Sequence, residues 1–253
     1  MINTRYRISC GRIAGRSHSA STTPCQDYAG ARRTHEMACI ALADGAGSRP
    51  HSEAGAKVVV KEALGLLADR FDEIDAAADS DPTLAAQMIM DHLLAALGKK
   101  AKGLGYEVGA LASTLLFAAH KANRFLAGHI GDGVIARLSH SGDAEIVSYP
   151  DNGEFANTTV FVTDPHAVRR FRLYRGDCDS QSIGFVLMSD GTAESLYEKS
   201  TGRAAAAICK LLTWNASLSK RKMKAVLDAN LKQAFAKKSA DDCSIALLSY
   251  CGR

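Results

Sequence analysis

The stretch Ala38-Cys39-Ile40-Ala41-Leu42-Ala43-Asp44-Gly45-Ala46-Gly47 joins an uninterrupted apolar run to an aspartate and a turn that contains two glycines. A short apolar run without polar alternation is typical of a strand that is buried on both faces. The glycines allow the backbone to bend sharply directly after the strand. The pattern therefore predicts that Asp44 stands at the end of a core strand, where a rigid carboxylate is well placed to hold a hard cation.

The same arrangement recurs three times along the chain. Residues 126–131 lead into Asp132-Gly133, residues 183–189 lead into Asp190-Gly191, and Asp241-Asp242 directly precede the apolar run 243–248. One Asp-Gly alone indicates no more than a turn, but strand ends from distant parts of a chain meet at one edge of a sheet. Carboxylates gathered there repel one another unless a cation neutralises them. Ligation by oxygen alone suits Mg²⁺ or Mn²⁺ rather than zinc.

Composition excludes several classes of protein. The chain has 253 residues, of which 47% are hydrophobic and 23% charged, as in an ordinary globular protein. No apolar run approaches the ~20 residues that span a bilayer, and the first residues lack the apolar core of a signal peptide. A net charge of +4 does not indicate a nucleic-acid partner. The seven cysteines form no C-x-x-C pair, and we expect them to be reduced thiols. We expect a cytoplasmic monomer that contacts neither membrane nor nucleic acid.

Periodicity predicts strands, then two helices, many antiparallel strands, two helices and a last strand. Strands are expected over 5–13, 27–33, 36–43, 112–120, 123–130, 134–139, 145–149, 160–163, 168–175, 183–189 and 243–250. Helices are expected from an N-cap at Ser52, then over 82–102, 202–212 and 219–237, with 17–24 a loop and 69–81 a connection. The order lacks βαβα alternation, so it indicates an α+β domain rather than a doubly wound sheet. We expect one domain over 1–253, with two stacked sheets covered by helices.

Taken in order, the carboxylate blocks resemble those of the metal-dependent protein serine/threonine phosphatases of type 2C, the PPM family. The blocks are Gln26-Asp27, Ala43-Asp44-Gly45-Ala46-Gly47, Ser113-Thr114, Gly131-Asp132-Gly133, Ser189-Asp190-Gly191 and Asp241-Asp242-Cys243-Ser244. Residues 153–159 also resemble a block of a compact bacterial branch of the family. The resemblance implies an α-β-β-α sandwich of two mainly antiparallel sheets flanked by helix pairs, which agrees with the element order.

The resemblance implies a site for two Mn²⁺ or Mg²⁺ ions. Asp44 would bridge the two ions, and the carbonyl of Gly45 would bind one of them. Asp190 and Asp241 would bind the other. A water between the ions would attack phosphorus in line, without a phosphoenzyme intermediate.

Two further aspartates take part in what the resemblance implies. Asp27 would act indirectly, by holding water of the metal site, and Asp132 would bind a third, weaker ion. The substrates implied are proteins that a kinase has phosphorylated on serine or threonine. Two alternatives stay open, namely a non-catalytic module that has kept the phosphatase fold, and a phosphatase of small phosphoesters.

The chain departs from the family at two positions. Thr22 stands where the family often has an arginine that contacts phosphate, and Arg16 and His18 are the upstream candidates for that role. Ala46 stands where many members have a histidine that is a proposed general acid. His18 is the nearest candidate for this catalytic role as well, against the alternative that it is a solvated histidine in a loop.

Overall fold

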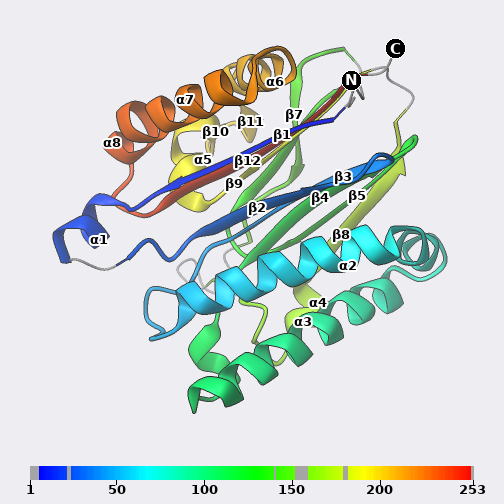
Figure 1. Ribbon diagram of the computed structural model, residues 1–253, viewed down its shortest axis with the longest axis vertical. Helices are drawn as coiled ribbons and strands as arrows, with labels where there is room; N and C mark the ends of the chain where they lie inside the picture. The colour runs from blue at the N-terminus through cyan, green and yellow to red at the C-terminus, as the bar shows by residue number, and fades with distance from the viewer. Residues whose placement is uncertain (1–5, 22–23, 140, 152–158, 179–181, 252–253) are drawn as a thin grey trace.

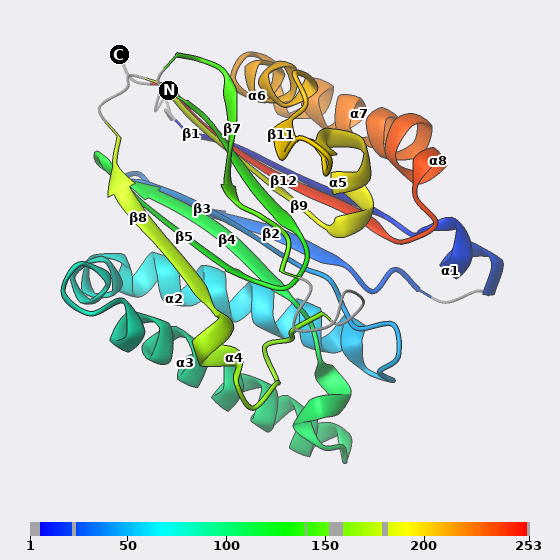
Figure 2. The same cartoon turned by 180° about the vertical axis from the view of Figure 1, so that it is seen from behind.

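Two five-stranded antiparallel sheets stack face to face, and helices cover the outer face of each (Figures 1 and 2). The computed structural model describes residues 6–21, 24–139, 141–151, 159–178 and 182–251. The predicted α-β-β-α sandwich is thereby confirmed. Within these ranges, no helix is both long enough and apolar enough to cross a membrane.

The first sheet joins the N-terminal strand to the C-terminal one. Its order is β1 (Tyr6–Ile13), β12 (Cys243–Cys251), β9 (Ser182–Met188), β6 (Val134–Leu138) and β7 (Ala144–Ser148). The second sheet has the order β2 (Tyr28–Arg33), β3 (Met37–Ala43), β4 (Leu115–Lys121), β5 (Arg124–Ile130) and β8 (Arg172–Asp177).

Two long helices and a set of C-terminal helices form the outer layers. α2 (Ser52–Ser80) and α3 (Pro82–Leu104) cover the second sheet. α6 (Ala207–Ser217) and α7 (Lys220–Asn230) cover the first, and α7 runs on through a π-helical turn, Leu231–Phe235, into α8 (Ala236–Lys238). The short elements are α1 (Arg16–Ser21), a 3₁₀ turn Val108–Leu111, α4 (Ala167–Arg170), α5 (Asp190–Leu196), β10 (Tyr197–Glu198) and β11 (Arg203–Ala204).

Strand β3 is buried along its whole length, as its apolar run predicts. Cys39 and Ala41 pack toward α2 and α3, whereas Ile40 and Leu42 pack between the sheets. Successive side chains of a strand point to opposite faces, so a strand with helices on one side and a second sheet on the other must be apolar at every position. This burial fixes the direction in which β3 delivers Asp44 to the end of the sandwich.

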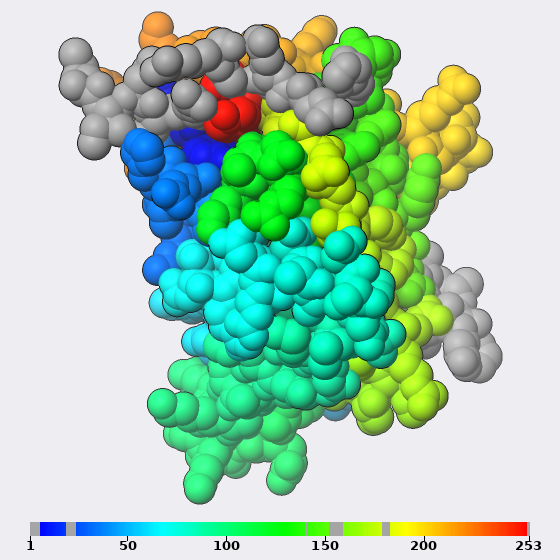
Figure 3. Space-filling view, turned by 90° about the vertical axis from the view of Figure 1, so that its right-hand side faces the viewer, coloured from blue at the N-terminus to red at the C-terminus, as the bar shows by residue number. Residues whose placement is uncertain are grey.

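Helix α2 continues through residues 69–80, so the predicted connection over 69–81 is wrong. Phe71, Ile74 and Ala78 continue the buried stripe of the helix beyond a kink at Arg70. Because Asp72, Asp75 and Asp79 accept hydrogen bonds from basic residues of the second sheet, the acidic composition of this stretch marks an ion-paired helix face. Figure 3 shows this end of α2, in cyan, against the green β4–β5 turn and yellow-green β8.

Other local predictions also differ from the structure, including the helix over 202–212, where Arg203–Ala204 form β11 and the helix begins at Ala207. Residues 16–21 form α1 rather than a loop, because backbone and side-chain bonds dock them on the turn before β12. Residues 160–163 form no strand, and 167–170 form α4 ahead of β8. Helix α5 was not predicted, since it is only seven residues long. The N-cap of α2 is His51, because Ser52 is already helical. The block at 153–159 lies outside the described residues except for Thr159.

Candidate active site

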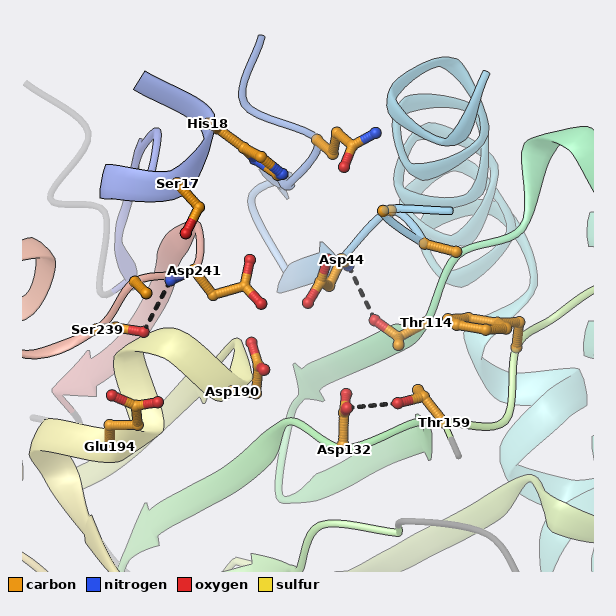
Figure 4. Close-up of a pocket in the computed structure, with 16 residues that line it drawn as sticks. Ser17, His18, Asp44, Thr114, Asp132, Thr159, Asp190, Glu194, Ser239 and Asp241 are labelled. Atoms are coloured by element: carbon orange, nitrogen blue, oxygen red, sulfur yellow. Dashed lines mark hydrogen bonds between the residues drawn. The ribbon is translucent and has the colours of Figure 1, made fainter. Parts of the chain in front are cut away.

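A cavity of about 440 Å³ opens at the end of the sandwich where β3, β5 and β9 end and β12 begins (Figure 4). Its walls come from segments that are far apart in the sequence. They are lined by Ser17, His18, Gln26, Asp44, Gly45, Ala46, Gly47, Thr114, Asp132, Thr159, Phe161, Asp190, Glu194, Ser239, Ala240 and Asp241. The four aspartates that follow or precede core strands in the sequence therefore do meet at one edge, as their positions predict.

Asp44 is held rigidly by the residue that precedes β4. The backbone N–H of Asp44 donates to Thr114 Oγ1 at 2.9 Å, and the N–H of Thr114 donates to the carbonyl of Asp44 at 2.8 Å. The next residue, Gly45, packs so tightly that a Cβ there would lie 2.9 Å from the carbonyl oxygen of Gln26. The backbone around Asp44 is thus fixed from two sides, which leaves its carboxylate to project into the cavity (Figure 4).

Asp190 and Asp241 face the cavity from the two elements that flank β9 and β12. Asp190 is the first residue of α5, and its Oδ1 accepts from the N–H of Gly191 at 2.6 Å. Oδ1 of Asp241 accepts from the N–H of Asp242 at 2.8 Å, and the N–H of Asp241 donates to Ser239 Oγ at 3.1 Å. Each carboxylate therefore uses one oxygen locally, and its other oxygen remains available to the cavity.

Asp132 follows β5 through Gly131, which has a φ of +115°. Only glycine adopts this conformation without strain, and a side chain there would also collide with Thr114. Oδ2 of Asp132 accepts from the hydroxyl of Thr159 at 2.6 Å (Figure 4). Thr159 thus orients the carboxylate that the sequence assigned to a third, weaker ion.

Asp27 lies directly before β2, is fully buried and does not line the cavity. Burial raises its pKa to about 7, with the hydroxyl of Ser244 opposing the rise, yet neither carboxylate oxygen reaches hydrogen-bond geometry within the described residues. A buried carboxyl group without hydrogen-bond partners is costly. A cation or an ordered water beside the cavity would satisfy it.

The cavity concentrates uncompensated negative charge. Burial raises the pKa of Asp44 well above its usual range, and four neighbouring carboxylates add to the rise. These are Asp27, Asp190, Asp132 and Asp241. Burial likewise raises the pKa of Asp190 to about 7, with contributions from Asp132 and Asp241. Among the described residues, no lysine or arginine lines the cavity to offset this charge.

The donor set fits a hard divalent cation. All candidate ligands are carboxylate or carbonyl oxygens, and burial together with repulsion by neighbouring carboxylates raises the pKa of Asp44 and of Asp190. In the described part of the chain, no group of three or more His, Cys, Asp or Glu side chains has the spacing of a metal site. The carboxylates therefore surround the cavity rather than a single point.

His18 lies in the cavity wall, whereas the other upstream candidate does not. Its Nδ1 is 2.9 Å from Oδ1 of Asp242, and 21% of its side chain is exposed. Arg16 does not line the cavity, and its Nε donates to the carbonyl of Ser239 at 3.3 Å. Ala46, where many family members have a histidine, lines the cavity with a methyl group. Thr22 lies outside the described residues.

Several residues of the site are not predicted from the sequence. Glu194 lines the cavity four residues after Asp190, on the next turn of α5, and a prediction of that helix would have placed both on one face. Asp242, Thr114 and Thr159 belong to the sequence motifs that resemble the family, but the motifs do not predict what these three side chains contact. Their roles depend on contacts with residues distant in sequence, which no local pattern shows.

Comparison with known proteins places this geometry in a family. A family model described as Protein phosphatase 2C matches residues 14–232. The chain is 28% identical over 175 residues to Serine/threonine-protein phosphatase 3 of Escherichia coli (strain K12), a match that covers 67% of each protein.

Solved bacterial phosphatases share the fold. The catalytic domain of the serine/threonine protein phosphatase PstP, solved in complex with two manganese ions, superposes with a TM-score of 0.63 at 16% identity, over 98% of this chain and 99% of that one. The S. agalactiae serine/threonine phosphatase superposes with a TM-score of 0.62 at 15% identity, over 97% and 99% of the two chains. The family match covers most of this chain, and the carboxylate-lined cavity lies where the family's acidic blocks meet. The chain belongs to the protein phosphatase 2C family of metal-dependent serine/threonine phosphatases.

Proposed function

We propose that the cavity hydrolyses phosphoserine and phosphothreonine in proteins with the help of two Mn²⁺ or Mg²⁺ ions. The observation that carries the proposal is the convergence of Asp44, Asp132, Asp190 and Asp241 on a cavity whose described lining contains no basic side chain except the imidazole of His18. A dianionic phosphate ester would be repelled from such a cavity, so positive charge must enter with it or before it.

The chain's own residues would have distinct tasks. Asp44 would hold both ions, with the carbonyl of Gly45 on one of them and Asp190 and Asp241 on the other. Such ions supply positive charge that stabilises the phosphoryl oxygens, and they activate water for attack. Thr114 would keep Asp44 in place through its two hydrogen bonds.

The remaining polar residues of the site would support these ligands. Asp27, with its two buried oxygens, would hold ordered water beside the ions. Asp132, oriented by Thr159, would bind a third and weaker ion. The substrates would be products of a serine/threonine kinase in the cytoplasm, and the enzyme would act as a monomer.

The alternatives make different demands on the cavity. A non-catalytic module has no use for mutually repelling carboxylates, whose raised pKa values mark an unfavourable arrangement in the absence of a cation. A phosphatase of small phosphoesters would need the same metal site, so the cavity chemistry alone does not separate it from a protein phosphatase.

One assay separates the three functions. The purified protein is incubated with phosphoserine and phosphothreonine peptides, and with small phosphate esters, in Mn²⁺ and in EDTA. We expect peptide turnover that requires the metal. Turnover of small esters alone would favour the second alternative. Absence of turnover, combined with retained peptide binding, would favour the module.

A further inference from the structure

Asp242 is a buried carboxylate that ties three segments of the site together. Only 1% of it is exposed. Its Oδ1 accepts from the N–H of Gly15 at 2.7 Å, and its Oδ2 accepts from the N–H of Gln26 at 2.6 Å. Its Oδ1 also lies 2.9 Å from Nδ1 of His18. Two backbone amides and one imidazole thus surround a charge that would otherwise be costly to bury.

The backbone of α1 is docked on the turn that carries Asp241 and Asp242. The N–H of Ser17 donates to the carbonyl of Ala240 at 3.1 Å, and Nε of Arg16 donates to the carbonyl of Ser239. Gly15 approaches so closely that a Cβ there would lie 2.3 Å from the carbonyl carbon of Asp241. His18 therefore enters the cavity wall from a backbone with little freedom, and Nδ1 of its ring lies against the carboxylate of Asp242.

The cavity requires a proton donor that Ala46 cannot supply. An alkoxide that leaves from phosphoserine must be protonated, because its conjugate acid is far weaker than that of an aryl leaving group. Among the described residues of the lining there is no lysine, tyrosine or cysteine, and cation binding would keep the carboxyl groups ionised. His18 points from α1 into the cavity (Figure 4).

We propose that Asp242 is a positioning residue that holds the Nδ1 side of His18, and that His18 uses Nε2 to protonate the leaving oxygen of the substrate. The inference rests on the proposed phosphatase function. In the step, the bond between phosphorus and the leaving oxygen breaks, its electron pair goes to that oxygen, and the proton of Nε2 follows. The attacking water forms the new bond to phosphorus and releases one proton to solvent, and His18 regains its proton from solvent.

The test compares two leaving groups in Mn²⁺. The kcat values of the unmutated protein, of His18→Ala and of Asp242→Asn are measured on a phosphoserine peptide and on an aryl phosphate. A positioned general acid is worth ~10²–10⁴ in rate. We therefore expect His18→Ala to lower kcat about a hundredfold or more on phosphoserine and only slightly on the aryl phosphate. Asp242→Asn should shift the same ratio in the same direction, by about tenfold.

The double variant and a matched control separate positioning from structure. If Asp242 acts through His18, the ratio of the kcat values on the two substrates shifts no further in the double variant than in His18→Ala alone. Arg16→Ala removes a different bond between α1 and the same turn, so it should leave the ratio of the two kcat values unchanged. Melting temperatures of all variants report any loss of folding.

Several outcomes would overturn the inference. An unchanged ratio in His18→Ala would do so alone, even if Asp242→Asn failed to fold. An equal loss on both substrates in Asp242→Asn, or an effect that adds to that of His18→Ala, would assign Asp242 a structural role only. If the unmutated protein turned over neither substrate, the proposed function itself would fail, which is a distinct result.

Discussion

Two groups of aspartates lie beyond opposite ends of β4, and they differ in whether basic side chains lie beside them. At the Lys121 end, Asp72, Asp75 and Asp79 of α2 meet Lys121, Arg124 and Arg175 of the second sheet, and we call these six residues the ion-pair cluster. At the Thr114 end, the aspartates of the cavity have no lysine or arginine beside them among the described lining residues.

The pKa values follow this difference. The hydrogen bond from Lys121 lowers the pKa of Asp72, although that carboxylate is largely exposed. Burial raises the pKa of Asp44 and Asp190 at the other end, and their mutual repulsion adds to the rise. Basic side chains neutralise the aspartates of the ion-pair cluster, which pack α2 against the second sheet. The cavity aspartates have no such partners in the described lining, as expected where a cation from solution binds.

The largest expected effect is on activity at the unneutralised end. Asp44→Asn should lower kcat on a phosphopeptide by about 10³-fold or more, as expected for a lost electrostatic stabiliser of the transition state. Chelation of the metal by EDTA should have an equal effect, and added Mn²⁺ or Mg²⁺ should restore only the unmutated protein. The measurement is steady-state turnover with Asp75→Asn as control, which should retain activity. Full turnover in EDTA would contradict the assignment of the cavity.

The second prediction is a pH dependence of stability that Asp190 of the cavity contributes. The pKa of Asp190 rises from an ordinary 3.8 to about 7 in the folded protein. Between these values the folded state holds a proton that the unfolded state has lost, so Asp190 should contribute a loss of stability in the metal-free protein as pH rises from about 4 to about 7. Buried His120 and His129, whose pKa values burial lowers, contribute in the opposite sense, so the effect of Asp190 is read from the difference between the unmutated protein and Asp190→Asn. The expected loss is about 2–4 kcal/mol. It is measured by urea unfolding in EDTA, and it should shrink in Asp190→Asn. An identical pH dependence in the unmutated protein and in Asp190→Asn would refute the prediction.

The third prediction is that replacing an aspartate by asparagine changes stability in opposite directions at the two ends of β4. In metal-free protein at pH 7.5, Asp44→Asn should raise the melting temperature, because it removes a buried carboxyl group that neighbouring carboxylates repel. Asp75→Asn should lower stability by about 1–3 kcal/mol, because its hydrogen bonds to two arginines are lost. Thermal unfolding of both variants measures the two changes. A change of melting temperature in the same direction in both variants would contradict the prediction.

The smallest expected effect concerns a hydroxyl that supports a ligand. Thr114→Val removes the acceptor of the Asp44 N–H while keeping the shape of the side chain. We expect a loss of activity of about 10-fold, as for other groups that orient a metal ligand. Thr114→Ser keeps the hydroxyl and is the matched control, which should retain most of the activity in the same assay. If both variants lost activity equally, packing rather than the hydrogen bond would be responsible.

The sequence predicted well those parts of the fold whose signal is local. The apolar run 38–43, the strand ends at Asp132 and Asp190 and the helix from Pro82 all lie where periodicity placed them. It failed over 69–81, because acidic residues that pair across to a sheet look the same in sequence as a solvated connection. It also failed at 160–163, where an apolar stretch packs without pairing as a strand.

The sequence by itself determined that the aspartates would gather, because each one adjoins a strand too apolar to lie anywhere but in the core. It also determined the family, through the order of its acidic blocks. Only the tertiary structure decided which residues support those aspartates. The pairing of Asp242 with His18 spans more than 200 residues of chain and depends on β1 and β12 lying side by side. Such contacts result from sheet topology, which brings residues together irrespective of their spacing in the sequence.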